Sequence, residues 1–313
     1  MSKRRKKKNT QESADAPDAS PARFRAIKAA LAAVVTAAVG CAAVYGLGAL
    51  REQVAHTLPY QVSASSLRLV EGPSWMTPGI LAELDVGLLD PDFPQRFSLL
   101  DEGVTERIAA AYERCVWVER VKRIEKHDPR VDPSRPPLEI VLKFRRPMAF
   151  VRTARGCCLL DADGVRLPGM YREPQLGAER LLVVRGVSTR QPAVGQAWSD
   201  ASLSAGLRVA RAVESRRQRF RLASVDVSNF GGRRDPHETE IALVTASGTR
   251  IKWGKAPSPE AARLREKSPA EKLAYLAYVY EQMGGRVDGV LAYIDIPNEA
   301  VCRRSATAPT LRS

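Results

Sequence analysis

The sequence predicts a mixed α+β protein with a single N-terminal transmembrane helix, and three observations lead to this fold class. Residues 29–50 form a run of 22 positions without a charged side chain. After that run, segments with the apolar alternation of strands are mixed with segments of helical spacing. The composition, 44% hydrophobic and 27% charged, is that of a globular chain and excludes disordered and multi-pass membrane proteins.

The uncharged run is long enough to cross a membrane. As a helix it would extend roughly 33 Å at about 1.5 Å per residue, against a hydrocarbon core of about 30 Å. Residues 1–28 hold nine lysines and arginines against three acidic residues. Because basic flanks stay on the cytoplasmic side, we predict a basic cytoplasmic tail at 1–28, a transmembrane helix at 29–50 in the inner membrane, and later residues outside the cytoplasm.

Two other interpretations of the N-terminus stay open. A cleaved secretory signal also has a basic start and an apolar stretch, although that stretch is usually about 7 to 15 residues long. Either a signal or a span exports the rest of the chain. The net charge of +14 also allows a nucleic-acid arm at Lys3 to Lys8, but basic residues beside a span more often set topology and contact anionic lipid. We therefore expect a membrane contact and no nucleic acid.

Sequence motifs of catalytic chemistry are missing. The chain contains no Gly-x-Ser-x-Gly, no His-Glu-x-x-His and no phosphate-binding glycine loop, and its three histidines are scattered. Asp161 and Asp163 are compatible with a calcium loop, but the closing glutamate is missing and a plain turn is favoured. We predict a protein that is not an enzyme and that has no cofactor and no metal.

The five cysteines do not form a metal-binding pattern. Cys41 lies in the uncharged run, whereas Cys115, Cys157, Cys158 and Cys302 follow it without a Cys-x-x-Cys pair or a histidine at zinc-ligand spacing. Adjacent Cys157 and Cys158 would point to opposite faces of a strand. We expect one optional disulfide or none.

The first part of the exported chain combines helices and strands with proline-rich loops. Residues 98–101 have the form of a helix-capping box, and the apolar residues from Leu100 to Cys115 follow at helical spacing. Residues 116–124 fit a helix or a strand equally well. A loop with four prolines at 128–137 precedes a clear strand at 138–144.

The second part alternates hairpins with two strong helices. A turn at 161–164 joins two short strands, and a helix begins at Ser268 with a capping box and ends at Gly284-Gly285. The last strand should run from Glu299 to Arg303, and residues 305–313 should form a disordered tail. The other predicted elements are a helix at 203–213 and strands at 222–229, 240–246, 250–254 and 290–296.

The order of these features resembles the bacterial cell-division family called FtsQ or DivIB. The likeness covers some 240 residues. It is carried by short motifs in the family's order: Trp117-Val118, Phe144 to Phe150, Leu159 to Val165, Ile251 to Gly254, Glu271-Lys272-Leu273, Tyr293 to Ile296, and Ala300-Val301. Pro297 departs from the family's arginine, and residues 256–267 look inserted.

The resemblance implies a domain organisation. Residues 51–151 would form a juxtamembrane segment and a POTRA domain with a start strand at 67–72, which makes 116–124 a strand and 138–150 the strand that closes the domain. Residues 152–304 would form an FtsQ-type β domain, mixed and β-rich, with an extended sheet and a C-terminal helix.

The resemblance also implies a function. Such a protein is a divisome scaffold at the septum, which recruits FtsB/FtsL-like coiled-coil proteins and the septal wall synthesis complex. A terminal strand at a sheet edge offers unpaired backbone groups to which a partner strand can add. On matching positions, this site comprises Tyr293, Ile294, Asp295, Ile296, Glu299, Ala300, Val301, Cys302 and Arg303, with Tyr293 as the anchor.

Three alternatives remain beside this function. These residues could simply close a domain sheet. A POTRA-type assembly or secretion factor would bind exported polypeptides with the same edge-strand chemistry. A membrane-tethered envelope enzyme is a third class, and no sequence motif favours it.

Overall fold

The computed structural model describes residues 21–55, 57, 60–69, 72–176 and 179–303. The chain divides into two units, 1–61 and 62–313, which are described separately. The predicted tail at 305–313 and most of the basic tail lie outside the described residues.

The first unit consists mainly of one long helix, α1 (Pro21–Ala55), which contains the predicted run. Its segment Lys28–Val54 has a mean hydropathy of 2.0, and it is the one helix of the described residues that is long and apolar enough to cross a membrane. The apolar side chains along it are exposed, Leu31 and Val44 by 66% and 71%. Such an exposed apolar helix is typical of a membrane span or of a signal sequence.

The second unit begins with a small α/β part. Its three-stranded sheet has the order β2-β5-β4, with β2 parallel and β4 antiparallel to β5. Helix α4 packs on β4 and buries Ile108, Ala111 and Tyr112. The elements are β1 (Gln61–Ser63), η2 (Ala64–Ser66), β2 (Arg68–Leu69), α2 (Pro78–Ala82), α3 (Val86–Leu89), β3 (Arg96–Ser98), α4 (Val104–Glu113), β4 (Val118–Lys126) and β5 (Leu138–Phe144).

Two predictions for this part are wrong in detail. The capping box at 98–101 does not begin a helix: the Asp101 carboxylate accepts from the Ser98 amide at 3.2 Å and closes a turn, while α4 begins at Val104 after Gly103, whose φ is 81°. The run 138–150 is not one strand, because β5 ends at Phe144 and the chain enters another sheet at Pro147. The strand expected within 116–124 is confirmed as β4.

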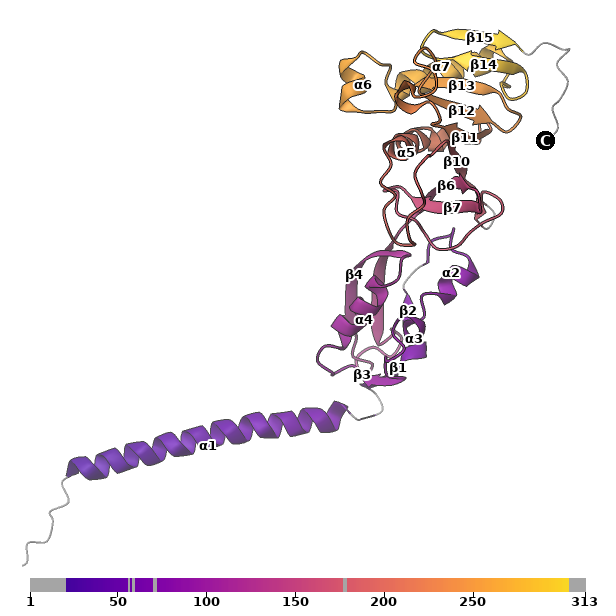
Figure 1. Ribbon diagram of the computed structural model, residues 1–313. Coiled ribbons are helices and arrows are strands. Elements are labelled where there is room, and N and C mark those ends of the chain that lie inside the picture. The colour runs from indigo at the N-terminus through magenta and orange to yellow at the C-terminus, as the bar shows by residue number, and fades with distance from the viewer. Residues whose placement is uncertain (1–20, 56, 58–59, 70–71, 177–178, 304–313) are drawn as a thin grey trace, which may run out of the picture. The chain divides into compact units, whose positions relative to one another are not determined.

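The rest of the unit is built on an eight-stranded mixed sheet (Figure 1). The strand order is β15-β14-β13-β12-β11-β10-β6-β7, and the pairs β6/β10, β10/β11 and β13/β14 are parallel. The strands are β6 (Pro147–Thr153), β7 (Gly156–Asp161), β10 (Leu182–Arg185), β11 (Leu222–Asp226), β12 (Ile241–Thr245), β13 (Arg250–Gly254), β14 (Leu291–Asp295) and β15 (Ala300–Arg303). The other elements of this part of the chain are β8 (Gln175–Leu176), β9 (Glu179–Arg180), α5 (Ala201–Val213), η3 (Glu214–Arg216), η4 (Phe230–Gly232), α6 (Pro259–Arg263) and α7 (Pro269–Gln282).

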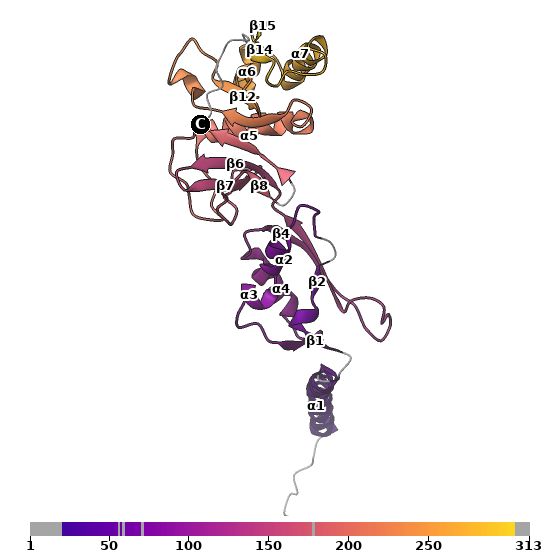
Figure 2. The same ribbon diagram turned by 90° about the vertical axis from the view of Figure 1, so that its right-hand side faces the viewer.

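Helices α5 and α7 cover one face of this sheet. Helix α5 packs on β6, β10 and β11 and contacts α7, and Figure 2 shows α7 beside β14. A Cβ on Gly206 of α5 would lie 2.9 Å from a methyl group of Val184, so a glycine is needed where this helix approaches the sheet. Trp253, Leu276 and Ile294 are all 0% exposed in the resulting core.

The predicted turn at 161–164 is confirmed. Gly164 has a φ of 80°, and the Asp161 carboxylate accepts from the amides of Asp163 and Val165 at 2.9 and 2.8 Å. Arg145 lies 3.1 Å from the other carboxylate oxygen. The second arm of the predicted hairpin is reduced to a bridge between Leu160 and Arg166.

Helix α7 begins at the predicted capping box and ends before Gly284. Its inner face contains a lysine that the apolar pattern did not predict. Lys272 is 2% exposed, and its ammonium donates to Glu266 Oε1 at 2.5 Å and to the Lys255 carbonyl at 3.1 Å. Burial lowers the pKa of Lys272 despite this partner.

We predict that Ser268→Ala lowers the free energy of unfolding by about 1 kcal/mol, because the cap accepts from the Glu271 amide and starts a core helix. A urea titration of the full chain in detergent, followed by tryptophan fluorescence, measures this. Ser204→Ala, on the exposed face of α5, is the matched control and should change stability by less than about 0.5 kcal/mol. Equal losses in both variants would contradict the role of the cap.

Candidate functional site

Strand β15 is the outermost strand of the large sheet and holds four of the predicted site residues. It pairs on one side with β14, in the register Tyr293 to Cys302, Ile294 to Val301 and Asp295 to Ala300. Among the described residues no strand pairs with its other side. Backbone groups on that outer side can therefore accept an added strand.

The nine predicted residues occupy different environments at this edge. Ile294 and Ile296 are 0% exposed in the core, so they support the edge from behind and do not present their side chains. Tyr293 and Val301 are 38% and 44% exposed. Glu299 precedes β15 with a φ of 52°, and Asp295, Ala300, Cys302 and Arg303 complete the set in β14 and β15.

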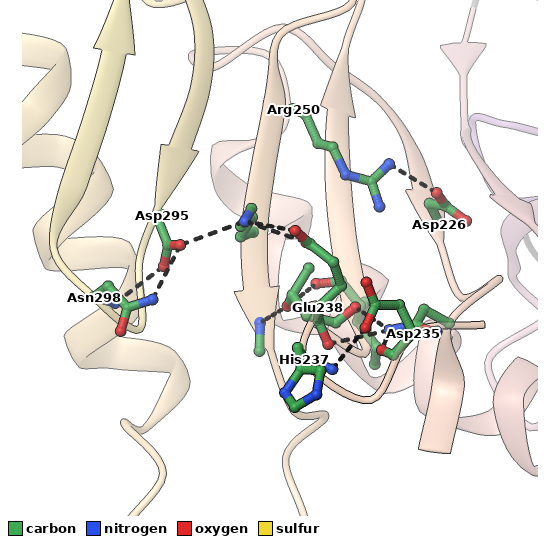
Figure 3. Close-up of polar contacts among 12 residues, drawn as sticks. Asp226, Asp235, His237, Glu238, Arg250, Asp295 and Asn298 are labelled. Atoms are coloured by element: carbon green, nitrogen blue, oxygen red, sulfur yellow. Dashed lines mark hydrogen bonds and ion pairs between the residues drawn. The ribbon is translucent and has the colours of Figure 1, made fainter. Parts of the chain in front are cut away.

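The turn between β14 and β15 is held by Asp295. Its Oδ1 accepts from the Asn298 amide at 3.0 Å and its Oδ2 from the Asn298 side chain at 3.1 Å (Figure 3). Lys267 donates to the Ile296 carbonyl at 3.2 Å and also pairs with Glu299. These contacts fix the point at which β15 begins.

A row of charged side chains lies on the sheet face opposite the helices. Arg250 and Lys252 alternate with buried Ile251 and Trp253, so both point to this face. Arg250 Nη1 lies 3.0 Å from Asp226 Oδ2. Lys252 Nζ lies 3.2 Å from Glu238 Oε2 and 3.7 Å from Asp295 Oδ2.

Lys252 also positions the proposed anchor. Its ammonium lies 5.4 Å from the centre of the Tyr293 ring, on the neighbouring strand. A cation over the ring face attracts the ring electrostatically. Tyr293 is thus a half-exposed aromatic side chain held in place by a charge, beside the free edge.

A groove of about 400 Å³ opens next to this face. Its walls are the segment 231–240, part of β13 and the β14–β15 turn, and they include His237, Glu238, Lys252 and Asn298. Glu238 and Asp295, which lie in different walls, both contact Lys252 (Figure 3).

Asn229 organises one wall of the groove, and sequence reasoning missed it. Its amide donates to the carbonyls of Asp235, Glu238 and Thr239 at 2.9 to 3.1 Å. Its oxygen accepts from the amides of Arg234 and Asp235 at 2.9 Å. The signal available in the sequence was the cluster of turn-forming residues after Asn229, which indicates a loop but not its hub.

One cluster of possible metal ligands lies among the described residues. Glu125, His127 and Glu139 each bring one ligand atom within 4.8 Å of the others. Arg123 pairs with both glutamates at 3.1 and 3.8 Å, so an arginine already occupies these carboxylates, and we assign no ion there. All five cysteines are free, and Cys115, Cys157 and Cys158 are buried.

No known protein family matches the sequence, and no curated protein matches it.

The Asp226–Arg250 pair gives a prediction about charge. Burial favours the neutral carboxyl, but hydrogen bonds from Ser228 and Arg250 outweigh it and hold the pKa of Asp226 below its usual 3.8. The pair therefore stabilises the fold at neutral pH, and that contribution is lost as pH falls below about 3.8.

We predict that Arg250→Gln raises the pKa of Asp226 and costs less than about 1 kcal/mol at neutral pH, since the Arg250 side chain is 42% exposed. A carbon-13 NMR titration of aspartate-labelled protein measures the pKa. Arg208→Gln, on the exposed side of α5, should leave it unchanged. An Asp226 pKa that does not move in Arg250→Gln would disprove the assignment.

Proposed function

We propose that the protein is a membrane-anchored, non-enzymatic scaffold of the FtsQ/DivIB kind, which binds partner proteins by strand addition at β15. The observation that carries the proposal is the free edge of β15, with half-exposed Tyr293 beside it. Its residues are those that the family resemblance implied for partner binding.

The order of elements supports the same proposal. An apolar helix comes first. The small α/β part follows it, and its sheet takes one strand from before helices α2 to α4 and two strands from after them. We interpret this part as a POTRA domain and the eight-stranded sheet as the FtsQ-type β domain. The sheet boundary at residues 145–146 is a few residues earlier than the predicted domain boundary at 151–152.

Strand addition requires an edge that is already ordered. β15 is held in an extended form by its pairing with β14, by the turn at Asp295 and by the buried Ile294 of β14. A partner then orders only itself, which lowers the cost of binding. We propose FtsB/FtsL-like coiled-coil proteins as partners, and the septal wall synthesis complex as the assembly that they link to the scaffold.

The proposal includes a topology. Residues 1–28 lie in the cytoplasm, residues 29–50 of α1 cross the inner membrane and residues 51–313 lie outside, at the septum. The N-terminal charge and the exposed apolar surface of α1 support this orientation.

We predict that a protease added to intact spheroplasts digests residues 62–313 and leaves an N-terminal fragment protected. Two tags, one before Lys3 and one after Ser313, allow both ends to be followed by blotting. Lysed spheroplasts are the control, in which both tags should disappear. Loss of the N-terminal tag before lysis would contradict the topology, and a mature chain without it would indicate a cleaved signal.

We predict that Tyr293→Ala weakens partner binding at least about tenfold, because an aromatic anchor commonly contributes 2 kcal/mol or more. Tyr278→Ala, which removes a 60% exposed tyrosine from α7, is the matched control and should bind normally. The measurement is a pull-down from membrane extract, quantified for septal coiled-coil proteins, with the full chain as bait.

A second form of the bait ends at Asn298 and lacks β15. It should lose the same septal proteins, and its melting temperature shows whether the rest of the sheet stays folded. If exported polypeptides or wall enzymes bind every form equally and septal proteins bind none, the scaffold proposal is wrong. An assembly or secretion factor would then be the better interpretation.

A further inference from the structure

A basic cavity lies at the opposite end of the large sheet from β15. It has a volume of about 410 Å³ and is formed by the end of the β6–β7 hairpin and the segment 187–191. Arg152, Arg155 and Arg190 line it, together with Thr189 and Gln191. Its apolar wall consists of Val151, Val187 and Trp198.

The hairpin wall is rigid. Thr153 Oγ1 donates to the Gly156 carbonyl at 3.0 Å and accepts from the Arg155 amide at 3.3 Å. Gly156 has a φ of 135°, and a Cβ there would lie 2.8 Å from the Tyr171 carbonyl oxygen. Arg152 and Arg155 therefore stand on a turn with little freedom to rearrange.

The opposite wall is held by partly buried hydrogen bonds. Trp198 Nε1 donates to Thr189 Oγ1 at 2.8 Å, and Thr189 Oγ1 donates to Asp200 Oδ2 at 2.8 Å. Cys158 Sγ lies 3.0 Å from Gln191 Oε1. These contacts hold both polar side chains against the sheet before any ligand arrives.

The electrostatics of the cavity are one-sided. No acidic residue lines it among the residues that the structure describes, and the three arginines are exposed. The acidic group that contacts its wall, Asp200, is 8% exposed, and Thr189, Ser202 and the Leu203 amide occupy its oxygens. Those hydrogen bonds outweigh burial and lower the pKa of Asp200.

We propose that this cavity binds an organic phosphate. Guanidinium groups present paired N–H donors that match phosphate oxygens, and three of them around one cavity suit a group with more than one negative charge. A single peptide carboxylate has one charge and two oxygens, which makes it a poorer match. The wall of Val151, Val187 and Trp198 provides a surface for the organic part.

The phosphate has two possible sources, a phospholipid headgroup or a soluble phosphate ester, and both share this chemistry. The inference does not depend on the scaffold function, because the cavity and β15 lie at opposite ends of the strand order.

The test is calorimetric titration of the full chain in a neutral detergent with glycerol 3-phosphate and with dihexanoyl phosphatidic acid. The double variant R152Q/R190Q should bind each phosphate probe about 100-fold more weakly, because the loss of each arginine should weaken the affinity about tenfold. R208Q/R211Q removes the same charge from exposed α5 positions outside the cavity and should bind within about twofold of the unmodified chain. If R152Q/R190Q melts early, R155Q alone repeats the test.

The outcomes separate the alternatives. Tighter binding of the phosphatidic acid by more than about tenfold identifies a headgroup site, and equal binding identifies a soluble ester. The proposal is overturned if neither phosphate probe binds saturably, or if R208Q/R211Q loses as much binding as R152Q/R190Q. It is also overturned if a tetraglutamate peptide binds with the same arginine dependence while the phosphate probes do not, since the ligand would then be an acidic polypeptide.

Discussion

Burial of one face of the eight-stranded sheet under α5 and α7 is the constraint on which the rest of the large sheet depends. That face supplies the main core, with Trp253, Leu276 and Ile294 all fully buried. The opposite face is divided in two. Near β6 and β7 the chain covers it again, since the Tyr171 ring packs on Phe150 with centres 5.2 Å apart. Near β13 to β15 it carries Arg250, Lys252 and Tyr293, which remain partly open to solvent.

The two proposed sites follow from this arrangement because each uses an end that the helices leave uncovered. At one end, β15 has β14 as its only neighbour among the described strands, and the buried Ile294 holds β14 in place. At the other end, the β6–β7 hairpin extends past the sheet and carries exposed Arg152 and Arg155. Both sites consist of exposed groups on a backbone that the core has already ordered. This lowers the conformational entropy that is lost on binding.

Local sequence patterns predicted the helices and strands in which buried and exposed residues follow a regular period. The capping box at Ser268 and the alternation Arg250-Ile251-Lys252-Trp253 each describe one face of one element, and both elements formed where expected. Prediction failed where a tertiary partner decides the outcome. Lys272, for example, is buried only because Glu266 and the Lys255 carbonyl meet it. At Ser98 the reason is local, because the Asp101 carboxylate closes a turn there and α4 begins only after Gly103. Arg152 and Arg190 are 38 positions apart in sequence, so no local motif could reveal their cavity.

The energetics of strand addition argue that β15 cannot be the whole partner site. In a strand of four residues, about two point their backbone N–H and C=O groups to the outer side of the edge. These groups offer about four backbone hydrogen bonds, each with a net value of roughly 0.5–1.5 kcal/mol. Ordering a disordered partner segment costs about 2–5 kcal/mol or more, so the backbone contribution is nearly cancelled. Affinity and choice of partner must therefore come from side chains beside the edge. Tyr293, held by Lys252, and the groove bounded by His237 and Asn298 are the features available for that purpose.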